Sequence, residues 1–216
     1  MATNIFLLLD MSTSMMDGQE STIDACNEFM DGQMANTVGT DAVVSIRVFN
    51  TYIGSEDLVN NVPLSETPRI DQNNYQPSGG TPLYDAIGDS IESIGEYDGQ
   101  VLFIVQTDGE ENSSIRFNRD DVVRIVKEKT SEGWQFVYLG CDIDAMESGF
   151  ELGISAGNTM SYTRSDTGKA FEDLKMSTAR YLTRDPIQSN EFFSEVEEDS
   201  GKNGSDRGSD SPKTVA

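Results

Sequence analysis

Apolar runs and helical stripes alternate along most of this chain. Apolar runs of strand length occupy residues 4–10, 42–49, 101–108, 134–140 and 158–162. Apolar residues at helical spacing lie between and after these runs, over residues 20–36, after Thr81, after Asn118, and over 145–152 and 166–182. Strands that alternate with helices are typical of a parallel sheet covered on both faces. We therefore predict a doubly wound, mostly parallel α/β fold, similar to a Rossmann fold.

One pair of strands departs from this alternation. Val44, Ile46 and Val48 alternate with polar or small residues, and the segment runs into residues 50–54 with no helix in between. Such a connection predicts a hairpin, so that one edge strand is antiparallel and the sheet has six strands in all. The following stretch, residues 60–75, contains Pro63 and Pro68, and we predict that it is irregular.

Two helix starts carry local signals. Thr81 is a favourable N-cap residue, and Pro82 then occupies the first helical position, where its missing N–H costs little. The apolar stripe of this helix is Leu83, Ile87, Ile91 and Ile94. Asn118 is expected to cap the next long helix.

The character of the chain changes after Pro186. Residues 195–199 are acidic, and residues 200–212 consist largely of Gly, Ser, Asp and Lys. A segment of this composition cannot bury enough apolar surface to fold. We predict one domain over residues 1–183 and a disordered acidic, Gly/Ser-rich tail over residues 184–216. One alternative stays open, in which Phe192 and Phe193 dock on the domain.

Net charge restricts the classes of partner. The chain carries 38 acidic and 15 basic residues, a formal net charge of −23, and only −4 of it falls after residue 183. Such a surface repels phosphate backbones, so we expect no nucleic-acid binding. It favours cations and basic partner surfaces, although a high charge also serves solubility alone.

Membrane association is not expected either. No apolar run approaches the ~20 residues that span a bilayer. The N-terminal residues read as a strand and lack the basic region and cleavage site of a signal peptide. We therefore expect a cytoplasmic protein.

The chain contains no histidine and only two cysteines. The absence of histidine removes the most common general base and the most common zinc ligand. Cys26 and Cys141 are far apart in sequence and neither has a Cys-x-x-Cys partner. A disulfide framework or a thiolate zinc site is therefore not expected.

Oxygen-bearing side chains gather where two buried strands end. The first strand runs into Asp10-Met11-Ser12-Thr13-Ser14, and a later apolar strand ends at Asp108. The carboxyl ends of neighbouring parallel strands meet in the crevice where strand order reverses, which is where such sheets bind ligands. A lone aspartate there would be expected to cap a helix. Two converging carboxylates repel each other unless a cation lies between them, and all-oxygen ligands suit Mg²⁺, Mn²⁺ or Ca²⁺.

Together with the loop Gly79-Gly80-Thr81-Pro82-Leu83, these segments closely resemble the von Willebrand factor A (VWA) family over roughly residues 4–181. That family binds a metal in a metal-ion-dependent adhesion site (MIDAS) formed by Asp-x-Ser-x-Ser, a distant Thr and a distant Asp. The matching positions are Asp10, Ser12, Ser14, Thr81 and Asp108. The chain looks most like cytosolic bacterial and phage members, including those associated with tellurite resistance. Many members have glycine where Thr13 stands, a change that leaves the ligand positions unaffected.

The resemblance implies a non-enzymatic, metal-dependent protein-interaction module. In the family the hydroxyls bind Mg²⁺, Mn²⁺ or Ca²⁺ directly, while one or both aspartates act through water. One coordination position then receives an Asp or Glu carboxylate from a partner protein. In some relatives ligand binding is coupled to sliding of the last helix, here residues 166–182. The resemblance also places the protein in the cytoplasm of a bacterial cell or a phage-infected host.

The rim of this site holds further acidic residues. Glu110, Glu111 and Asn112 follow Asp108, and they either shape partner choice or form a solvated loop. Asp142 and Asp144 follow another strand at the same edge of the sheet. We expect them to cap the next helix rather than to form a second cation site.

Two other functions compete with this interpretation. The first is a structural or assembly component of a phage particle. The second is a Mg²⁺-dependent phosphatase, because a strand-terminal aspartate such as Asp10 can accept a phosphoryl group. The haloacid-dehalogenase pattern, however, needs a second aspartate where Ser12 stands, and the chain has no phosphate-binding Gly-x-x-x-x-Gly-Lys-Ser/Thr loop. We therefore predict no enzymatic activity and no catalytic residues.

Overall fold

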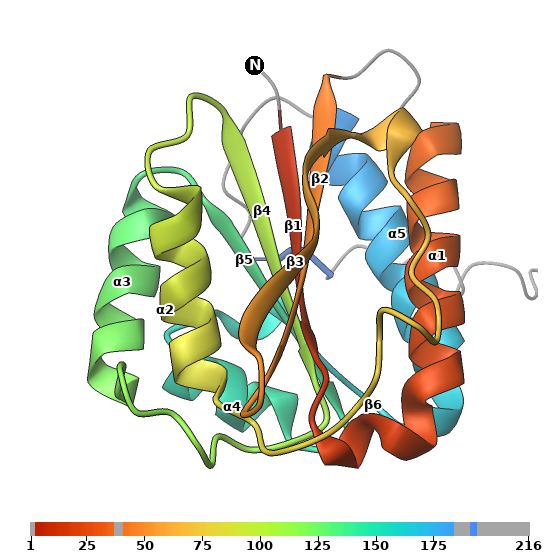
Figure 1. Ribbon diagram of the computed structural model, residues 1–216. Coiled ribbons are helices and arrows are strands. Elements are labelled where there is room, and N and C mark those ends of the chain that lie inside the picture. The colour runs from red at the N-terminus through yellow and green to blue at the C-terminus, as the bar shows by residue number, and fades with distance from the viewer. Residues whose placement is uncertain (1–2, 37–40, 184–190, 194–216) are drawn as a thin grey trace, which may run out of the picture.

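The computed structural model describes residues 3–36, 41–183 and 191–193. Within these residues a single six-stranded sheet has the order β3-β2-β1-β4-β5-β6. The strands are β1 (Thr3–Asp10), β2 (Ala42–Asn50), β3 (Gly54–Pro63), β4 (Gln100–Thr107), β5 (Gln135–Cys141) and β6 (Thr159–Tyr162). All neighbouring pairs are parallel except β2 and β3, which are antiparallel (Figure 1). The predicted α/β fold with one antiparallel edge strand is confirmed.

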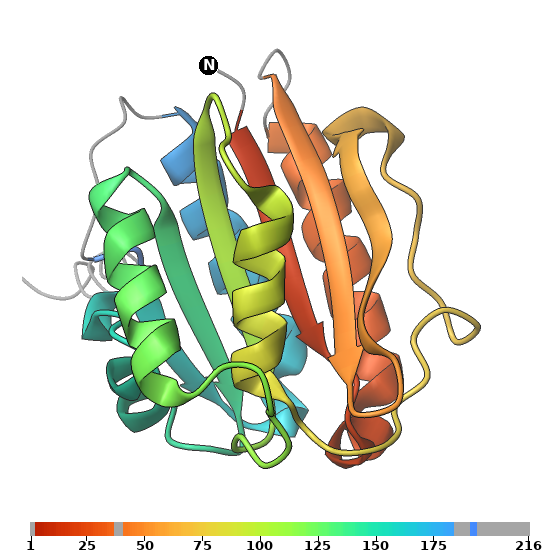
Figure 2. The ribbon, with the colours of Figure 1, turned by 60° about the vertical axis from the view of Figure 1, so that its left-hand side comes forward.

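Helices cover both faces of the sheet. Helices α1 (Gln19–Asn36) and α5 (Thr167–Thr183) lie on one face, and α2 (Leu83–Ile94) and α3 (Arg119–Ser131) lie on the other (Figures 1 and 2). The short helix α4 (Ala145–Glu151) connects β5 to β6. Every predicted long helix is therefore present.

The central strand β1 joins two hydrophobic cores. Successive side chains of a strand point to opposite faces, so Ile5, Leu7 and Leu9 belong to the core under α1 and α5, and Phe6 and Leu8 to the core under α2 and α3. All eight residues of β1 are buried. Because the whole strand is buried, Asp10 is held at its carboxyl end, at the edge of the sheet.

Aromatic pairs consolidate each core. Phe29 of α1 meets Phe171 of α5 edge to face, with ring centroids 6.5 Å apart. On the other face Phe6 and Phe103, on neighbouring strands, stack at 5.0 Å. Such pairs stabilise a core beyond the area that they bury.

Strand β3 is longer than the sequence pattern indicated. It runs from Gly54 to Pro63, so residues 60–63, which we predicted to be irregular, pair with β2. The prediction is wrong here because proline usually disfavours a strand, whereas Pro63 stands at the end of one. An edge strand has one side without a partner strand, and it tolerates proline at its end.

The start of α2 also differs from the prediction. The N-cap is Pro82, which has no capping side chain, and the helix begins at Leu83 rather than at Pro82. Thr81 therefore does not cap the helix. Its N–H instead donates to Asn112 Oδ1 at 2.9 Å. The predicted cap of α3 is confirmed, because Asn118 accepts the Asp121 N–H at 3.1 Å.

Most of the predicted tail lies outside the described residues, namely 184–190 and 194–216. The docking that the sequence left open is present for residues 191–193. Phe192 is 5% exposed, and its ring lies 6.2 Å from that of Tyr181 on α5. The Phe192 N–H also donates to Asn158 Oδ1 at 3.1 Å.

Across residues 3–36, 41–183 and 191–193, none of the helices has the length and apolar character that crossing a bilayer requires.

Candidate metal centre

The candidate site lies where strand order reverses. β1 and β4 are neighbours and pair in parallel through Leu9 and Gln106. Their carboxyl ends therefore bring Asp10 and Asp108 to the same edge of the sheet. The loops after Met11 and before α2 meet there too, because the Thr13 N–H donates to the Gly79 carbonyl at 3.0 Å.

Asp10 is fully buried and firmly held. One carboxylate oxygen accepts the Ser12 N–H at 2.7 Å, and the other accepts the Thr107 hydroxyl at 2.6 Å. The pKa of Asp10 is raised to about 6, because burial and, to a smaller extent, the charge of Asp108 outweigh the opposing effect of these hydrogen bonds. Within the described residues no cationic side chain pairs with Asp10.

The three hydroxyls lie beside the two carboxylates. Ser12 Oγ lies 3.0 Å from Ser14 Oγ, and Ser14 Oγ donates to Asp108 Oδ1 at 2.6 Å. Thr81 is buried close by, since a β-carbon on Gly109 would lie 3.3 Å from Thr81 Oγ1 and 3.6 Å from Ser14 Oγ. The structure thus gathers all the side chains that the sequence proposed as ligands.

These oxygens fit a small divalent cation. Ligands at right angles, each 2.0–2.1 Å from Mg²⁺, are about 2.9 Å from each other. The separations of 3.0 Å and 2.6 Å along Ser12, Ser14 and Asp108 are close to that value. Neither here nor elsewhere in the described part of the chain do three His, Cys, Asp or Glu residues form a metal-binding group, so hydroxyl ligands would have to complete this site. Ser14 is exposed, so the hydroxyl side of the site faces solvent.

Arg164 is a site residue that sequence reasoning missed. It lies in the 3-10 helix Arg164–Asp166 directly before α5, and its guanidinium donates to Asp108 Oδ2 at 2.8 Å. It is also 3.5 Å from Asp142 and 3.7 Å from Asp17. Burial raises the pKa of Asp108, whose side chain is 0% exposed, while the Ser14 hydrogen bond and the Arg164 charge oppose that rise. An isolated arginine before the last helix gives no spacing signal, so only the fold reveals this contact.

Glu111 on the rim has a structural role. Its carboxylate accepts the N–H of Tyr84 at 2.9 Å and those of Ser113 and Ser114 at 2.7 Å each. It therefore caps α2 from a different loop and replaces the cap that Thr81 does not provide. The sequence left a solvated loop or partner choice open for Glu111, and neither describes this role.

The acids after β5 divide between two roles. Asp144 caps α4 by accepting the Glu147 N–H at 3.1 Å, as predicted. Asp142 instead has a positive φ of 55° and accepts the Arg164 N–H at 3.2 Å. The expectation that both residues cap the helix is therefore right only for Asp144.

Comparison with known proteins bears on the fold. A scan against models of protein families found no match, and a search of curated protein sequences found none either. Among solved structures, the von Willebrand factor domain of the type V pilus tip protein Mfa5 from Porphyromonas gingivalis is similar, with a TM-score of 0.65 and 9% identity. That similarity covers 86% of this chain and 98% of the Mfa5 domain.

Two longer proteins contain a similar domain. The pilus adhesin SpaC from Lactobacillus rhamnosus GG has a TM-score of 0.64 at 13% identity, covering 83% of this chain and 30% of SpaC. The ArnB paralog VWA2 from Sulfolobus acidocaldarius has a TM-score of 0.54 at 15% identity, covering 79% of this chain and 44% of that one. The chain therefore has a VWA-like fold and spans less than half of either of these two proteins. Identities this low establish the fold alone.

Proposed function

We propose that this protein is a divalent-metal-dependent protein-interaction module with a MIDAS, and that a partner carboxylate completes the metal's coordination. Asp10, Ser12, Ser14, Thr81 and Asp108 would hold the ion, preferably Mg²⁺, with Mn²⁺ or Ca²⁺ as alternatives. The observation that carries the proposal is the chain of oxygens from Ser12 through Ser14 to Asp108, closed from behind by the buried Asp10.

Charge balance supports a cation here. Asp10 and Asp108 are both buried, and Arg164 is the cation that pairs with Asp108 among the described residues. A divalent ion would supply Lewis acidity toward an outside carboxylate. Neutral hydroxyls donate little negative charge, so the bound ion would keep its affinity for a negative ligand. The exposed Ser14 marks the side from which that ligand would arrive.

Catalysis is not part of the proposal. The side chains around Asp10 are hydroxyls that hydrogen-bond to carboxylates, and the chain has no histidine to transfer protons. No acidic group lies two positions after Asp10, where Ser12 instead joins the hydroxyl chain. The similar pilus proteins are named as a tip protein and an adhesin, which agrees with a binding role.

Thermal unfolding with and without metal tests the site. Wild type and Asp108→Ala would be heated in EDTA and in Mg²⁺, Mn²⁺ or Ca²⁺. Saturation at a hundredfold excess over the dissociation constant stabilises a protein by about 2.7 kcal/mol, which corresponds to roughly 5–10 °C for a domain of this size. We expect that shift in wild type and none in the variant. An equal shift in both proteins, or none with any ion, would contradict the proposal.

Partner binding needs a separate measurement. Proteins captured on immobilised wild type in Mg²⁺ would be compared with those captured in EDTA and on Asp10→Ala. A partner that binds through a carboxylate should be lost under both conditions. Retention on Asp10→Ala would show that the interaction bypasses the metal.

A further inference from the structure

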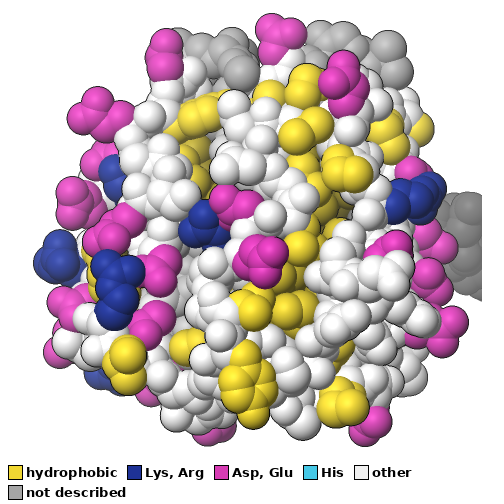
Figure 3. Space-filling model, in the orientation of Figure 1, with side chains coloured by type: hydrophobic (Ala, Val, Ile, Leu, Met, Phe, Trp, Pro, Cys, Tyr) yellow, Lys and Arg dark blue, Asp and Glu magenta, His cyan; other side chains and the backbone are white. Residues whose placement is uncertain are grey.

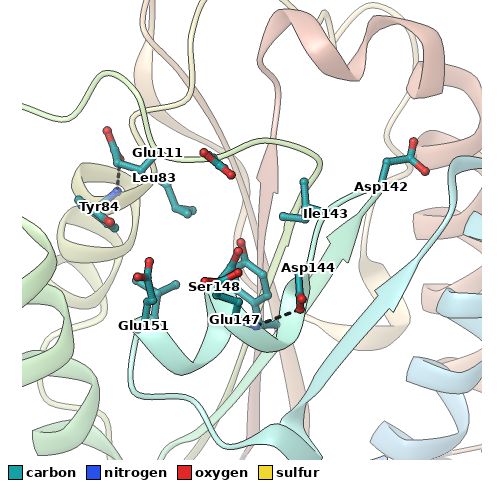
Figure 4. Close-up of a pocket in the computed structure, with 12 residues that line it drawn as sticks. Leu83, Tyr84, Glu111, Asp142, Ile143, Asp144, Glu147, Ser148 and Glu151 are labelled. Atoms are coloured by element: carbon teal, nitrogen blue, oxygen red, sulfur yellow. Dashed lines mark hydrogen bonds between the residues drawn. The ribbon is translucent and has the colours of Figure 1, made fainter.

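A cavity opens beside the candidate metal centre. It has a volume of about 490 Å³ and lies between the start of α2, the loop after β4, the loop after β5, and α4 (Figure 4). Leu83 and Glu110 line it, and they follow the proposed metal ligands Thr81 and Asp108 by two residues each. None of the five proposed metal ligands is part of its wall.

The wall is acidic and contains no basic residue among those described. Its acidic members are Glu110, Glu111, Asp142, Asp144, Glu147 and Glu151. Four of these are already engaged within the protein. Glu111 caps α2, Asp144 caps α4, Asp142 pairs with Arg164, and Glu151 pairs with Arg119.

Glu110 and Glu147 differ from the other four acids. Both are exposed, and neither carboxylate forms an ion pair or a hydrogen bond with a described residue. Figure 4 shows Glu147 on α4, across the cavity from Tyr84 at the start of α2 and from Glu111 in the loop after β4. On the face of the molecule drawn in Figure 3, acidic side chains are more prominent than basic ones. An acidic wall alone would not identify a ligand.

A buried hydroxyl in the same wall is the independent observation. Tyr138 lines the cavity and is 0% exposed, and its hydroxyl has no hydrogen-bond partner among the described residues. Burial raises the pKa of Tyr138, and the nearby groups Asp10, Tyr84 and Glu110 raise it further. Ser148 opposes that rise from close by but does not meet hydrogen-bond geometry. A buried polar group without a partner is costly, and a ligand with an N–H donor would satisfy it.

We propose that this cavity binds an arginine side chain of a partner protein. The guanidinium would meet the carboxylates of Glu110 and Glu147 and donate to the Tyr138 hydroxyl. Leu83 and Leu152 would contact its aliphatic stem, and the half-buried Tyr84 ring suits a cation–π contact. Where the proposed function holds, the partner would place a carboxylate on the metal and an arginine in the adjacent cavity.

The test uses a probe without a carboxylate and does not need the metal. Acetyl-Arg-Gly-Arg-amide would be titrated into ¹⁵N-labelled protein in EDTA at low ionic strength, with the citrulline peptide as a neutral probe of nearly the same shape. We expect amide shifts around α4 and the loop after β4 with the arginine peptide alone. Equal binding of the citrulline peptide would overturn the proposal.

Variants separate a specific cavity from a general acidic field. Glu147→Gln should weaken the arginine peptide about threefold to fivefold, the scale of an exposed ion pair. Tyr138→Phe should weaken it roughly tenfold or more through the lost hydrogen bond to a charged group. Glu28→Gln makes the same charge change at an exposed position of α1 and should leave the affinity unchanged. If Glu28→Gln weakens binding as much as Glu147→Gln, the attraction is diffuse and the proposal fails.

Two further measurements test whether the cavity prefers a protein side chain over another organic cation and whether it acts independently of the metal centre. Spermine that binds the cavity as tightly as the peptide would overturn the assignment to a protein side chain. Asp10→Ala should keep the arginine-peptide affinity while losing the response to Mg²⁺. If wild type binds the peptide but does not respond to any metal, the proposed function is refuted and the cavity proposal stands. If wild type responds to metal but does not bind the peptide, the cavity proposal alone is refuted.

Discussion

Asp10→Asn should stabilise the metal-free protein at neutral pH. The carboxylate of Asp10 is fully buried without a cationic partner among the described residues. Asparagine has almost the same shape, and it keeps an acceptor for the Ser12 N–H. Its amide nitrogen would donate to Thr107 Oγ1, and the Thr107 hydroxyl could then turn to the Gly109 carbonyl, already 3.1 Å away. The substitution therefore removes a buried charge without leaving a polar group unsatisfied.

The expected gain follows from the shifted pKa. The pKa of Asp10 rises from 3.8 to about 6 in the folded protein. At about 1.4 kcal/mol per unit, ionising the buried carboxylate destabilises the metal-free protein by roughly 3 kcal/mol above pH 6. The folded state binds more protons than the unfolded state between these two values. The stability of the wild type therefore falls as pH rises from about 4 to about 6.

Thermal unfolding in EDTA measures this difference. At pH 7.5 Asp10→Asn should melt roughly 6–12 °C above wild type, and at pH 5 about half of that gap should remain. Asp24→Asn, at an exposed position of α1, makes the same chemical change and should melt like wild type at both pH values. An Asp10→Asn protein that melts below wild type at pH 7.5 would refute the argument that burial penalises this charge.

Three further predictions concern other residues of the site and the fold. Arg164→Gln should raise Mg²⁺ affinity on the order of tenfold in calorimetric titration, because it removes the positive charge that pairs with Asp108. Equal or weaker affinity would contradict this prediction. Glu111→Ala should lower the free energy of unfolding in urea by about 2 kcal/mol through loss of the α2 cap, whereas Glu110→Ala should be neutral. Phe192→Ala should lower the free energy of unfolding by about 1–3 kcal/mol. This is less than the ~3–5 kcal/mol lost at a central core position, because the short segment 191–193 can detach. An unchanged unfolding midpoint would show that Phe192 does not contribute to stability.

The sequence predicts those parts of the fold that depend on local pattern and on strand ends. The apolar run of β1 and its alternation fix which side chains enter each core, and Asp10 follows from the point where that run stops. The expectation that the strands ending at Asp10 and Asp108 are neighbours, at the point where strand order reverses, is confirmed by β1 and β4. These two inferences were sufficient to bring Asp10 and Asp108 together.

The features that sequence reasoning missed depend on contacts between distant loops. Glu111 caps α2 across 27 residues of sequence, so the local Thr81-Pro82 signal pointed to the wrong cap. Arg164 reaches Asp108 across 56 residues, and no spacing rule connects them. Tyr138 appeared only as an apolar residue of a buried strand, and its hydroxyl became informative once the cavity beside it was known.

Arg164 gives the candidate site a physical link to the last helix. It lies directly before α5, and its guanidinium holds Asp108 while its backbone N–H donates to Asp142. A divalent ion next to Asp108 would repel this guanidinium, and the cost of moving it would fall on the start of α5. The opposite end of α5 carries Tyr181, against which Phe192 packs. Any displacement of α5 along its axis would therefore disturb the docking of residues 191–193. The contacts of Arg164 with Asp108 and of Tyr181 with Phe192 are sufficient to connect the candidate metal centre to this segment.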